Sequence, residues 1–535
     1  MPARVATPSE RAPVASTAAS WVWVPATLLA VTIAAWLTRH APAHIPDSEF
    51  YRAAARAARD GRPGWTDLTS YFSGFTPVQI LRHDGRTKFI EFPVGYPAYL
   101  GALSVPFGFE GAWRVGQLLA AGAIGWSTTV VVGARGGLRR RIVASCALTT
   151  VTLLSPAVTT SLLRVQTEFL LCALCALVLA GVLLHVRDGR AITLGAVAAA
   201  LAPLVRFVGV GLIALPLLAT RSLRPRSRVL LGLAMVTPAV LNQLWIVSSG
   251  STRGQNVQLL GTEYLTTAAR TAEGWFWKSG AADPRLSLDT TAWSWIALIA
   301  AVALVAVGAS ALRTASFRAQ GAWVPLAGAG ALLVVLLGGM IVADRYVRPD
   351  TRQLLPVQLC VLWFFAMVVV IGWDAWTSAT RWVVVAGVAV WMIAAIAPWS
   401  TLTMQIHEPA LAHRAEIAAA ARATGAKLIF SDDAGAVYTA SGIRSAYLPF
   451  DPNIITEQSV DETELTQQLV CNLSDHSAAV VLIPRVTLHN WGKVTAVLDH
   501  AVELGQLARS NTRHTVSYVS TEQSCPSGRA PATVP

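Results

Sequence analysis

Long apolar runs separated by short arginine-rich gaps make up most of the chain as far as Ala397. A helix of about 20 apolar residues spans the hydrocarbon core of a bilayer, and most of the runs approach that length. The pattern therefore predicts a polytopic α-helical membrane protein with about eleven transmembrane helices. These expected helices are Trp21–Leu37, Gly111–Val132, Ile142–Thr160, Val165–His185, Ala191–Pro203, Phe207–Ala219, Val229–Val247, Ala292–Leu312, Ala322–Val342, Leu354–Gly372 and Trp382–Ala397.

Two neighbouring runs, Ala191–Pro203 and Phe207–Ala219, are too short to cross the bilayer alone. A helix of that length reaches about 20 Å, less than the ~30 Å hydrocarbon core. Because Pro203 and Arg206 lie at their junction, we expect a helical pair that meets at a break. Tyr96–Phe107 is also short, and we expect it to form a helix at the outer membrane interface.

The arginines in the gaps indicate the orientation of the chain, because loops on the cytoplasmic side of a membrane are enriched in Lys and Arg. With the N-terminus inside, the inside segments hold fifteen arginines against the acids Glu10, Asp188 and Asp374. The arginines are Arg4, Arg11, Arg135, Arg139, Arg140, Arg141, Arg187, Arg190, Arg221, Arg224, Arg226, Arg228, Arg313, Arg318 and Arg381. We therefore expect a plasma-membrane protein with a cytoplasmic tail at 1–20, a transmembrane domain at 21–398, external loops at 39–110 and 248–291, and an external C-terminal domain at 399–535.

The C-terminal 399–535 region has a different pattern. Its segments KLIFSD, AVVLIP and HTVSYVS predict buried strands between helical stretches, which is typical of a small α/β domain. No glycine-rich phosphate loop follows a strand there, so no nucleotide is assigned. Cys471 and Cys525 are its only cysteines, and in an oxidising compartment we expect them to form a disulfide.

Composition agrees with a membrane protein. The chain is 54% hydrophobic and 13% charged, against about 25% charged for soluble proteins, which excludes an ordinary cytosolic enzyme. It also excludes a disordered chain, which would be poor in apolar residues. The net charge of +12 does not indicate a nucleic-acid partner, because the positive-inside rule accounts for many of the arginines.

Several ionisable residues on the expected outer side are not explained by the orientation rule. Charges within membrane segments cost several kcal/mol unless they face a polar cavity or a partner, so each is a functional candidate. Acids together with arginines suit a reaction in which a hydroxyl is deprotonated and an anionic group leaves. The candidates are Asp47, Glu49, Glu91, Arg164, Glu168, Arg206, Asp344, Arg345, Arg348, Asp350 and Arg352.

These candidates also have plainer interpretations. Asp47 is suited to cap the helix that follows it, since Asp favours N-cap positions. Glu168 lies four residues after Arg164, where the two would pair on one helix face. Three further alternatives are snorkelling to lipid headgroups for Arg206, a solvated loop charge for Glu91, and an interfacial anchor for 344–352.

Five short segments carry most of these residues and form a recognisable order. They are PDSEFY with Asp47, EFPVGYPAYL with Glu91, QTEFLL with Glu168, LVRFVGVGL with Arg206, and RQLLPV with Arg352. In this order the chain resembles the GT-C membrane glycosyltransferases, in the branch of protein O-mannosyltransferases and the lipid A aminoarabinose transferase. It departs from that branch at Val94, where a second proline is common, and at Gln353, where tyrosine is common.

The resemblance implies an inverting glycosyltransferase that uses a polyprenyl-phosphate sugar as donor. Asp47 would be the catalytic base that activates an acceptor hydroxyl, with Glu91 and Glu168 as further catalytic acids. Some relatives hold a divalent metal near the second acid and others need none, so Glu91 is the candidate metal ligand. The donor phosphate would contact Arg206, Arg345, Arg348 and Arg352, with Tyr346 in place of the usual tyrosine. A sugar of mannose or arabinose type would pass to an envelope glycan, lipid or protein.

Two other functions fit the same pattern. A lipid-linked sugar flippase or secondary transporter would also have broken helices and charges within the membrane. A ligase that moves whole lipid-linked glycans is the second. The large external α/β domain and the acidic first loop favour the transferase, and a transporter would be expected to show paired internal repeats.

Overall fold

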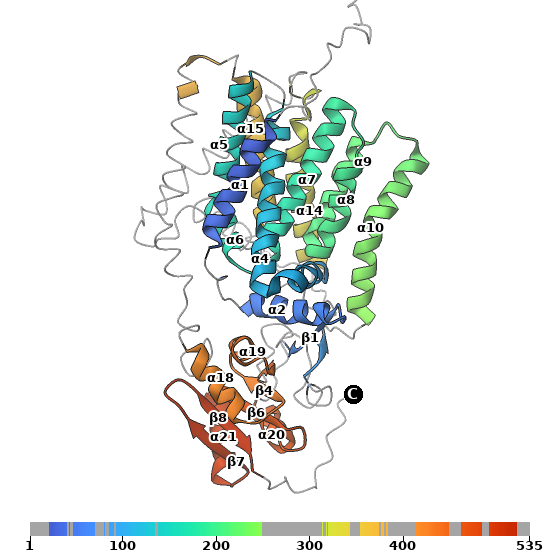
Figure 1. The fold of residues 1–535 in the computed structure, drawn as a ribbon. Helices are drawn as coiled ribbons and strands as arrows, with labels where there is room; N and C mark the ends of the chain where they lie inside the picture. The colour runs from blue at the N-terminus through green and yellow to red at the C-terminus, as the bar shows by residue number, and fades with distance from the viewer. Residues whose placement is uncertain are drawn as a thin grey trace, which may run out of the picture. The chain divides into compact units, whose positions relative to one another are not determined.

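The computed structural model describes two compact units of the chain (Figure 1). The described residues are 21–39, 46–69, 85–89, 93–133, 137–248, 319–342, 354–373, 413–448, 462–483 and 492–521, with a few isolated residues between them. The first unit is drawn from 1–42, 113–243 and 258–404, and the second from 43–112, 244–257 and 405–535.

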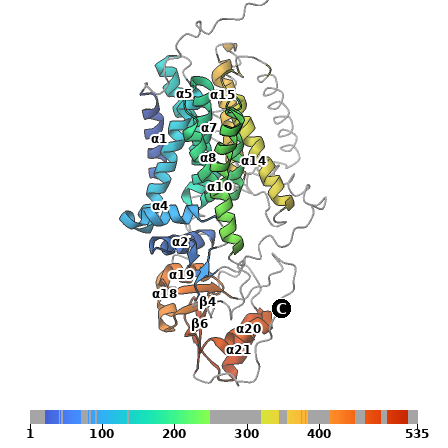
Figure 2. The ribbon, with the colours of Figure 1, turned by 90° about the vertical axis from the view of Figure 1, so that its right-hand side faces the viewer.

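The first unit is a bundle of apolar helices in which α7 packs against α8 and α14 against α15 (Figure 2). Its elements are α1 (Trp23–Leu37), the second part of α4 (Gly95–Val132), α5 (Leu138–Leu153), α6 (Pro156–Leu163), α7 (Thr167–Asp188), α8 (Thr193–Val205), the 3-10 helix η4 (Phe207–Ile213), α9 (Ala214–Ala219), most of α10 (Pro225–Ser248), α14 (Trp323–Val342) and α15 (Leu355–Gly372).

Among the described residues, four helices are long and apolar enough to cross a membrane. They are Gly95–Val132, Thr167–Asp188, Pro225–Trp245 and Leu355–Gly372, and shorter apolar helices accompany them. The expected helix at Ala292–Leu312 lies outside the described residues, as does nearly all of Trp382–Ala397. The total of eleven transmembrane helices therefore stays a prediction. The mostly helical fold of the described residues agrees with the apolar pattern.

Helix α7 forms the centre of the bundle and is buried along most of its length. A Cβ atom built on Gly181 would lie 2.4 Å from the backbone nitrogen of Gly195, so α7 and α8 approach too closely for any larger residue there. Small residues allow such close contact in membrane proteins, where packing rather than a hydrophobic driving force holds helices together.

Two helices break at residues that explain the break. The predicted span Ile142–Thr160 is wrong as a single helix, because α5 ends at Leu153 and α6 begins at Pro156. Proline lacks the amide donor and clashes with the preceding turn, so it begins a new helix. Within α4, Gly108 has φ +66° and separates the short predicted helix Tyr96–Phe107 from the apolar run that follows.

The second unit joins the first loop to the C-terminal part of the chain. The loop supplies α2 (Pro46–Arg59), β1 (Trp65–Thr66), β2 (Leu68–Thr69), β3 (Thr87–Lys88) and the first part of α4. Tyr51 in α2 packs edge-on against Tyr96 of α4, with ring centroids 5.2 Å apart. A Cβ atom on Gly101 would lie 2.8 Å from the carbonyl oxygen of Ala55, so these helices also lie very close.

The second unit contains a six-stranded sheet in the order β2-β5-β4-β6-β8-β7, in which all strands except β2 come from the C-terminal part. Its strands are β4 (Leu428–Ser431), β5 (Arg444–Tyr447), β6 (Ala478–Leu482), β7 (Leu507–Asn511) and β8 (Val516–Ser520). Strands β2, β5, β4 and β6 run parallel, and β8 and β7 are antiparallel to their neighbours. The segments KLIFSD, AVVLIP and HTVSYVS coincide with β4, β6 and β8.

Helices cover both faces of this sheet. Along β4, Leu428 and Phe430 contribute to one buried cluster, with α20 (Glu462–Asn472) and α21 (Gly492–Glu503). Ile429 points to the other cluster, with α18 (Arg414–Ala423) and α19 (Ala434–Ser441). This alternation is the two-residue period of a strand, and a parallel strand buried on both faces reads as a continuous apolar run.

Strand β2 belongs to the first loop and pairs with β5 of the C-terminal part, with Leu68 opposite Ser445 and Thr69 opposite Ala446. The compact unit at the C-terminus is therefore larger than the predicted domain 399–535, because it includes 43–112. Since strands of one sheet share hydrogen bonds, the first loop and the C-terminal part lie on the same side of any membrane.

Candidate functional site

The strongest candidate site in the first unit is an ion pair between Glu168 and Arg206. The guanidinium Nη1 of Arg206 donates to Glu168 Oε1, and it lies 3.2 Å from the hydroxyl oxygen of Thr167. The Thr167 hydroxyl in turn donates to Glu168 Oε2 at 3.3 Å. The three polar groups thus form one small network.

The local fold brings these residues together from two separate segments. Glu168 is the second residue of α7, so its side chain projects from the first turn of a buried helix. Arg206 lies between α8 and η4 with extended backbone, φ −156° and ψ 137°, at the predicted break in the short helical pair. Pro203 stands within the last turn of α8, where it disfavours continuation of regular helix.

Close backbone packing holds the break in place. A Cβ atom on Gly209 would lie 2.6 Å from the backbone of Ala202. On Gly211, a Cβ atom would lie 2.7 Å from the carbonyl oxygen of Ala331 in α14. The glycines of LVRFVGVGL therefore let η4 pack directly against α8 and α14, which fixes the backbone that carries Arg206.

Burial makes the pair energetically significant. The Glu168 side chain is 1% exposed and the Arg206 side chain is 17% exposed. Removing one partner of a buried ion pair typically costs about 3–5 kcal/mol, because the other charge is left without compensation. The pair has no general stability advantage over apolar residues of similar size, so its presence among apolar helices makes both residues candidates for a functional role.

The alternative that Glu168 pairs with Arg164 on one helix face is wrong. Helix α7 begins at Thr167, so Arg164 lies outside it and does not share a helix face with Glu168. The carbonyl oxygen of Arg164 instead accepts hydrogen bonds from the indole of Trp113 at 3.2 Å and the amide of Gln117 at 3.3 Å. The ion-pair partner of Glu168 comes from 38 residues later in the chain.

The acidic residues of the first loop belong to the second unit. Asp47 is the second residue of α2, which begins at Pro46, so it lies in the first helical turn rather than at the flanking N-cap position. Glu49 is buried, with 2% of its surface exposed. Its Cβ and Cγ atoms lie 3.1 Å from a Cβ built on Gly435 at the start of α19, so Glu49 of α2 packs directly against α19 of the C-terminal part.

The other predicted site residues lie outside the described part of the chain. These are Glu91, Arg345, Tyr346, Arg348, Arg352 and Cys525. Cys471, in α20, is disulfide-bonded. Cys146, Cys172, Cys175 and Cys360 are free thiols. Because Cys525 lies outside the described residues, its pairing with Cys471 stays a prediction.

One cluster was not anticipated from the sequence pattern. His413, Glu416 and His514 meet in the second unit, with their potential metal-ligand atoms within 4.8 Å of one another. The available signal was a His-x-x-Glu spacing at the start of the Ala-rich helix. That signal is weak alone, because the third residue lies 98 positions after the glutamate.

No protein-family model matches the chain, and no curated protein sequence matches it. The solved structures with similar folds include ArnT from Cupriavidus metallidurans bound to undecaprenyl phosphate, at 14% identity and a TM-score of 0.44 over 96% of this chain and 100% of that one. The apo state of that protein matches at 14% identity, with a TM-score of 0.43 over 94% and 98%.

An archaeal protein is also similar. The oligosaccharyltransferase of Archaeoglobus fulgidus, in a complex with zinc and sulfate, matches at 12% identity and a TM-score of 0.44, over 93% of this chain and 73% of that one. Both matches extend over more than nine tenths of this chain.

Proposed function

We propose that this chain is a membrane glycosyltransferase that moves a sugar from a polyprenyl-phosphate donor to a hydroxyl group of an envelope glycan, lipid or protein. The observation that carries the proposal is the buried Glu168–Arg206 ion pair at a helix start and a helix break. A charged donor headgroup attached to a long apolar tail is the kind of substrate that needs a fixed cation among apolar helices.

In this proposal Arg206 binds the donor phosphate. A guanidinium has five N–H donors in a planar fork that suits phosphate oxygens, and 17% of the Arg206 side chain stays exposed. Glu168 is almost fully buried, so we assign it a positioning role rather than contact with the acceptor. It holds the guanidinium in one orientation, and the predicted cations Arg345, Arg348 and Arg352 would supply the excess positive charge that a phosphate requires.

Asp47 is the proposed base. The acceptor oxygen attacks the anomeric carbon while the bond from that carbon to the phosphate oxygen breaks, and the hydroxyl proton passes to the Asp47 carboxylate. Polyprenyl phosphate leaves with the bonding electron pair and is stabilised by the arginines. Helix α2, which carries Asp47, is anchored by the buried side chains of Phe50 and Tyr51, so the base stands on a fixed element. Because Glu91 lies outside the described residues, no step is assigned to a metal.

We place the reaction on the outer face of the membrane. The fifteen-to-three excess of arginines over acids in the other segments supports this orientation. The shared sheet of β2 and β5 supports a common side for the first loop and the C-terminal part. A sugar of mannose or arabinose type is the proposed cargo.

A donor panel tests the proposal. Membranes that contain the chain are incubated with polyprenyl-phosphate sugars, each with a different labelled sugar, and the label in acceptor fractions is measured. We expect transfer from one donor, and Arg206→Ala should raise the apparent donor KM much more than Arg221→Ala, which alters an exposed arginine. Proteoliposomes that translocate the labelled lipid but never transfer its sugar would instead establish a flippase.

A further inference from the structure

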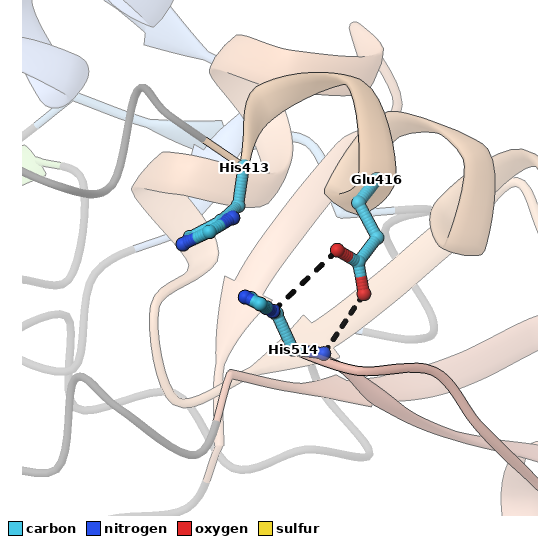
Figure 3. Close-up of side chains that lie close together, drawn as sticks. All are labelled: His413, Glu416 and His514. Carbon is cyan, nitrogen blue, oxygen red and sulfur yellow. Dashed lines mark hydrogen bonds and ion pairs between the residues drawn. The ribbon is translucent and has the colours of Figure 1, made fainter.

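Three side chains of metal-binding type meet in the C-terminal part of the second unit, at positions that the proposed transfer reaction does not use. His413 immediately precedes α18, Glu416 lies in the first turn of that helix, and His514 lies between β7 and β8. Their potential ligand atoms all lie within 4.8 Å of one another. Figure 3 shows the carboxylate of Glu416 directed toward His514, with the His413 ring beside it.

The carboxylate of Glu416 is held by the connection that carries His514. Its Oε1 accepts the backbone N–H of His514 at 2.8 Å and also accepts the hydroxyl of Thr512. Its Oε2 lies 3.6 Å from His514 Nδ1 (Figure 3). One oxygen therefore orients the group, and the other faces the imidazole. Metal-ligating carboxylates are commonly oriented by such outer hydrogen bonds.

The distances suit a small divalent cation. Zinc binds nitrogen and oxygen ligands at about 2.0–2.1 Å in tetrahedral sites, which places neighbouring ligand atoms about 3.4 Å apart. The separation of 3.6 Å between Glu416 Oε2 and His514 Nδ1 is already close to that value. The largest separation within the group, below 4.8 Å, closes with side-chain rotations that move ligand atoms by roughly 1 Å.

The charges also favour a cation between these groups. The imidazole rings of His413 and His514 have centroids 3.6 Å apart at an interplanar angle of 56°. Two protonated rings this close would repel each other, whereas two neutral rings offer lone pairs.

We propose that His413, Glu416 and His514 bind a zinc ion. Two imidazole nitrogens and one carboxylate oxygen form a donor set that zinc prefers, whereas calcium and magnesium prefer oxygen ligands alone. His413 and Glu416 are partly exposed, so the ion reaches the site from solvent. Bound zinc would join the start of α18 to the β7–β8 connection, and its fourth coordination position would hold water or a group from a ligand.

Zinc titration of the purified full-length chain tests the proposal. After treatment with a chelator, zinc is titrated against a competing chromophoric indicator. We expect one zinc per chain with micromolar or tighter affinity. His413→Ala and Glu416→Gln should weaken binding at least 100-fold, and in Glu416→Gln the new amide oxygen can still accept the bonds that hold the β7–β8 connection. The control is His500→Ala. His500 Nδ1 lies 3.2 Å from Glu503 Oε2 in an exposed pair, which offers one histidine and one carboxylate in place of two histidines and one carboxylate.

The zinc-loaded wild-type chain gives a second measurement that does not depend on folding of the variants. X-ray absorption at the zinc edge should show nitrogen and oxygen neighbours at about 2.0 Å, with the outer-shell signal of two imidazoles. Wild-type affinity in the millimolar range, equal affinity of the wild type and both variants, or a spectrum of oxygen neighbours alone would overturn the site. In that case Glu416 is only a clamp between helix and connection.

Discussion

Breaking the Glu168–Arg206 pair should separate its positioning role from simple packing. Glu168→Gln leaves the Arg206 charge among apolar helices without its anionic partner. With side-chain exposures of 1% and 17%, the loss lies in the range of a buried pair, about 3–5 kcal/mol of stability. Arg206→Met should cost a similar amount, because it leaves the carboxylate buried alone.

The double variant Glu168→Gln with Arg206→Met removes both charges. The double variant leaves no buried charge without a partner, so it should be more stable than either single variant. It should nevertheless bind no donor, because the phosphate-binding cation is absent. The matched control is Arg190→Ala, whose ion pair with Asp188 is longer, at 3.9 Å, and more exposed, so its effect should stay below about 1 kcal/mol.

Thermal unfolding in detergent measures these effects. A thiol-reactive fluorophore reports the unfolding of the helical bundle, because Cys172, Cys175 and Cys360 are free and buried. Labelled polyprenyl phosphate reports donor binding in the same samples. Single variants as stable as the wild type would refute the energetic coupling of Glu168 and Arg206. A double variant whose loss of stability equals the sum of the two single losses would also refute it. Donor binding by the double variant at wild-type affinity would refute the phosphate role of Arg206.

Further predictions concern the second unit. Burial raises the pKa of Asp432 to about 6 from 3.8, so its contribution to stability is full below pH 3.8 and is lost as pH rises through 6. Between pH 4 and 7, Asp432→Asn should therefore gain stability relative to the wild type by about 3 kcal/mol, measured by thermal unfolding at each pH; a difference that does not change with pH would contradict this. Cys471 and Cys525 should appear as one linked peptide pair in non-reducing mass spectrometry, and alkylation of both thiols without reductant would contradict it. Leu68→Pro should release the first loop from the sheet, because proline removes both the amide that donates to the Thr66 hydroxyl and the fully buried leucine side chain, and limited proteolysis between 59 and 95 should then accelerate; unchanged cleavage would argue against the β2–β5 pairing.

The apolar runs predict most of the described helices well, because a helix that crosses a membrane is apolar whether it faces lipid or other helices. The run Val165–His185 became α7 at Thr167–Asp188, and Leu354–Gly372 became α15 at Leu355–Gly372. The break at Arg206 was also visible, because a charge and a proline interrupt two short apolar runs. The failure at Ile142–Thr160 shows that composition alone hides a break when the proline stands within an apolar stretch.

Contacts between distant segments were not predictable. Strand β2 has two residues, too few for an alternating pattern, and its partner β5 lies far along the chain. The choice of Arg206 over Arg164 as partner of Glu168 depends on where α7 begins, which no propensity fixes to within one turn. The cluster of His413, Glu416 and His514 depends on the packing of α18 against the β7–β8 connection.

Asp47→Asn tests the central claim of glycosyl transfer most directly. Labelled sugar transfer from the donor identified by the panel is measured beside donor binding and expression. An amide cannot accept the acceptor proton, so transfer should fall at least about 100-fold while donor binding stays normal. The change to the first turn of α2 costs only about 0.3–1 kcal/mol of helix-dipole interaction, too little to explain such a loss. Near-normal transfer by Asp47→Asn would contradict the proposed base and leave Asp47 with a purely structural role.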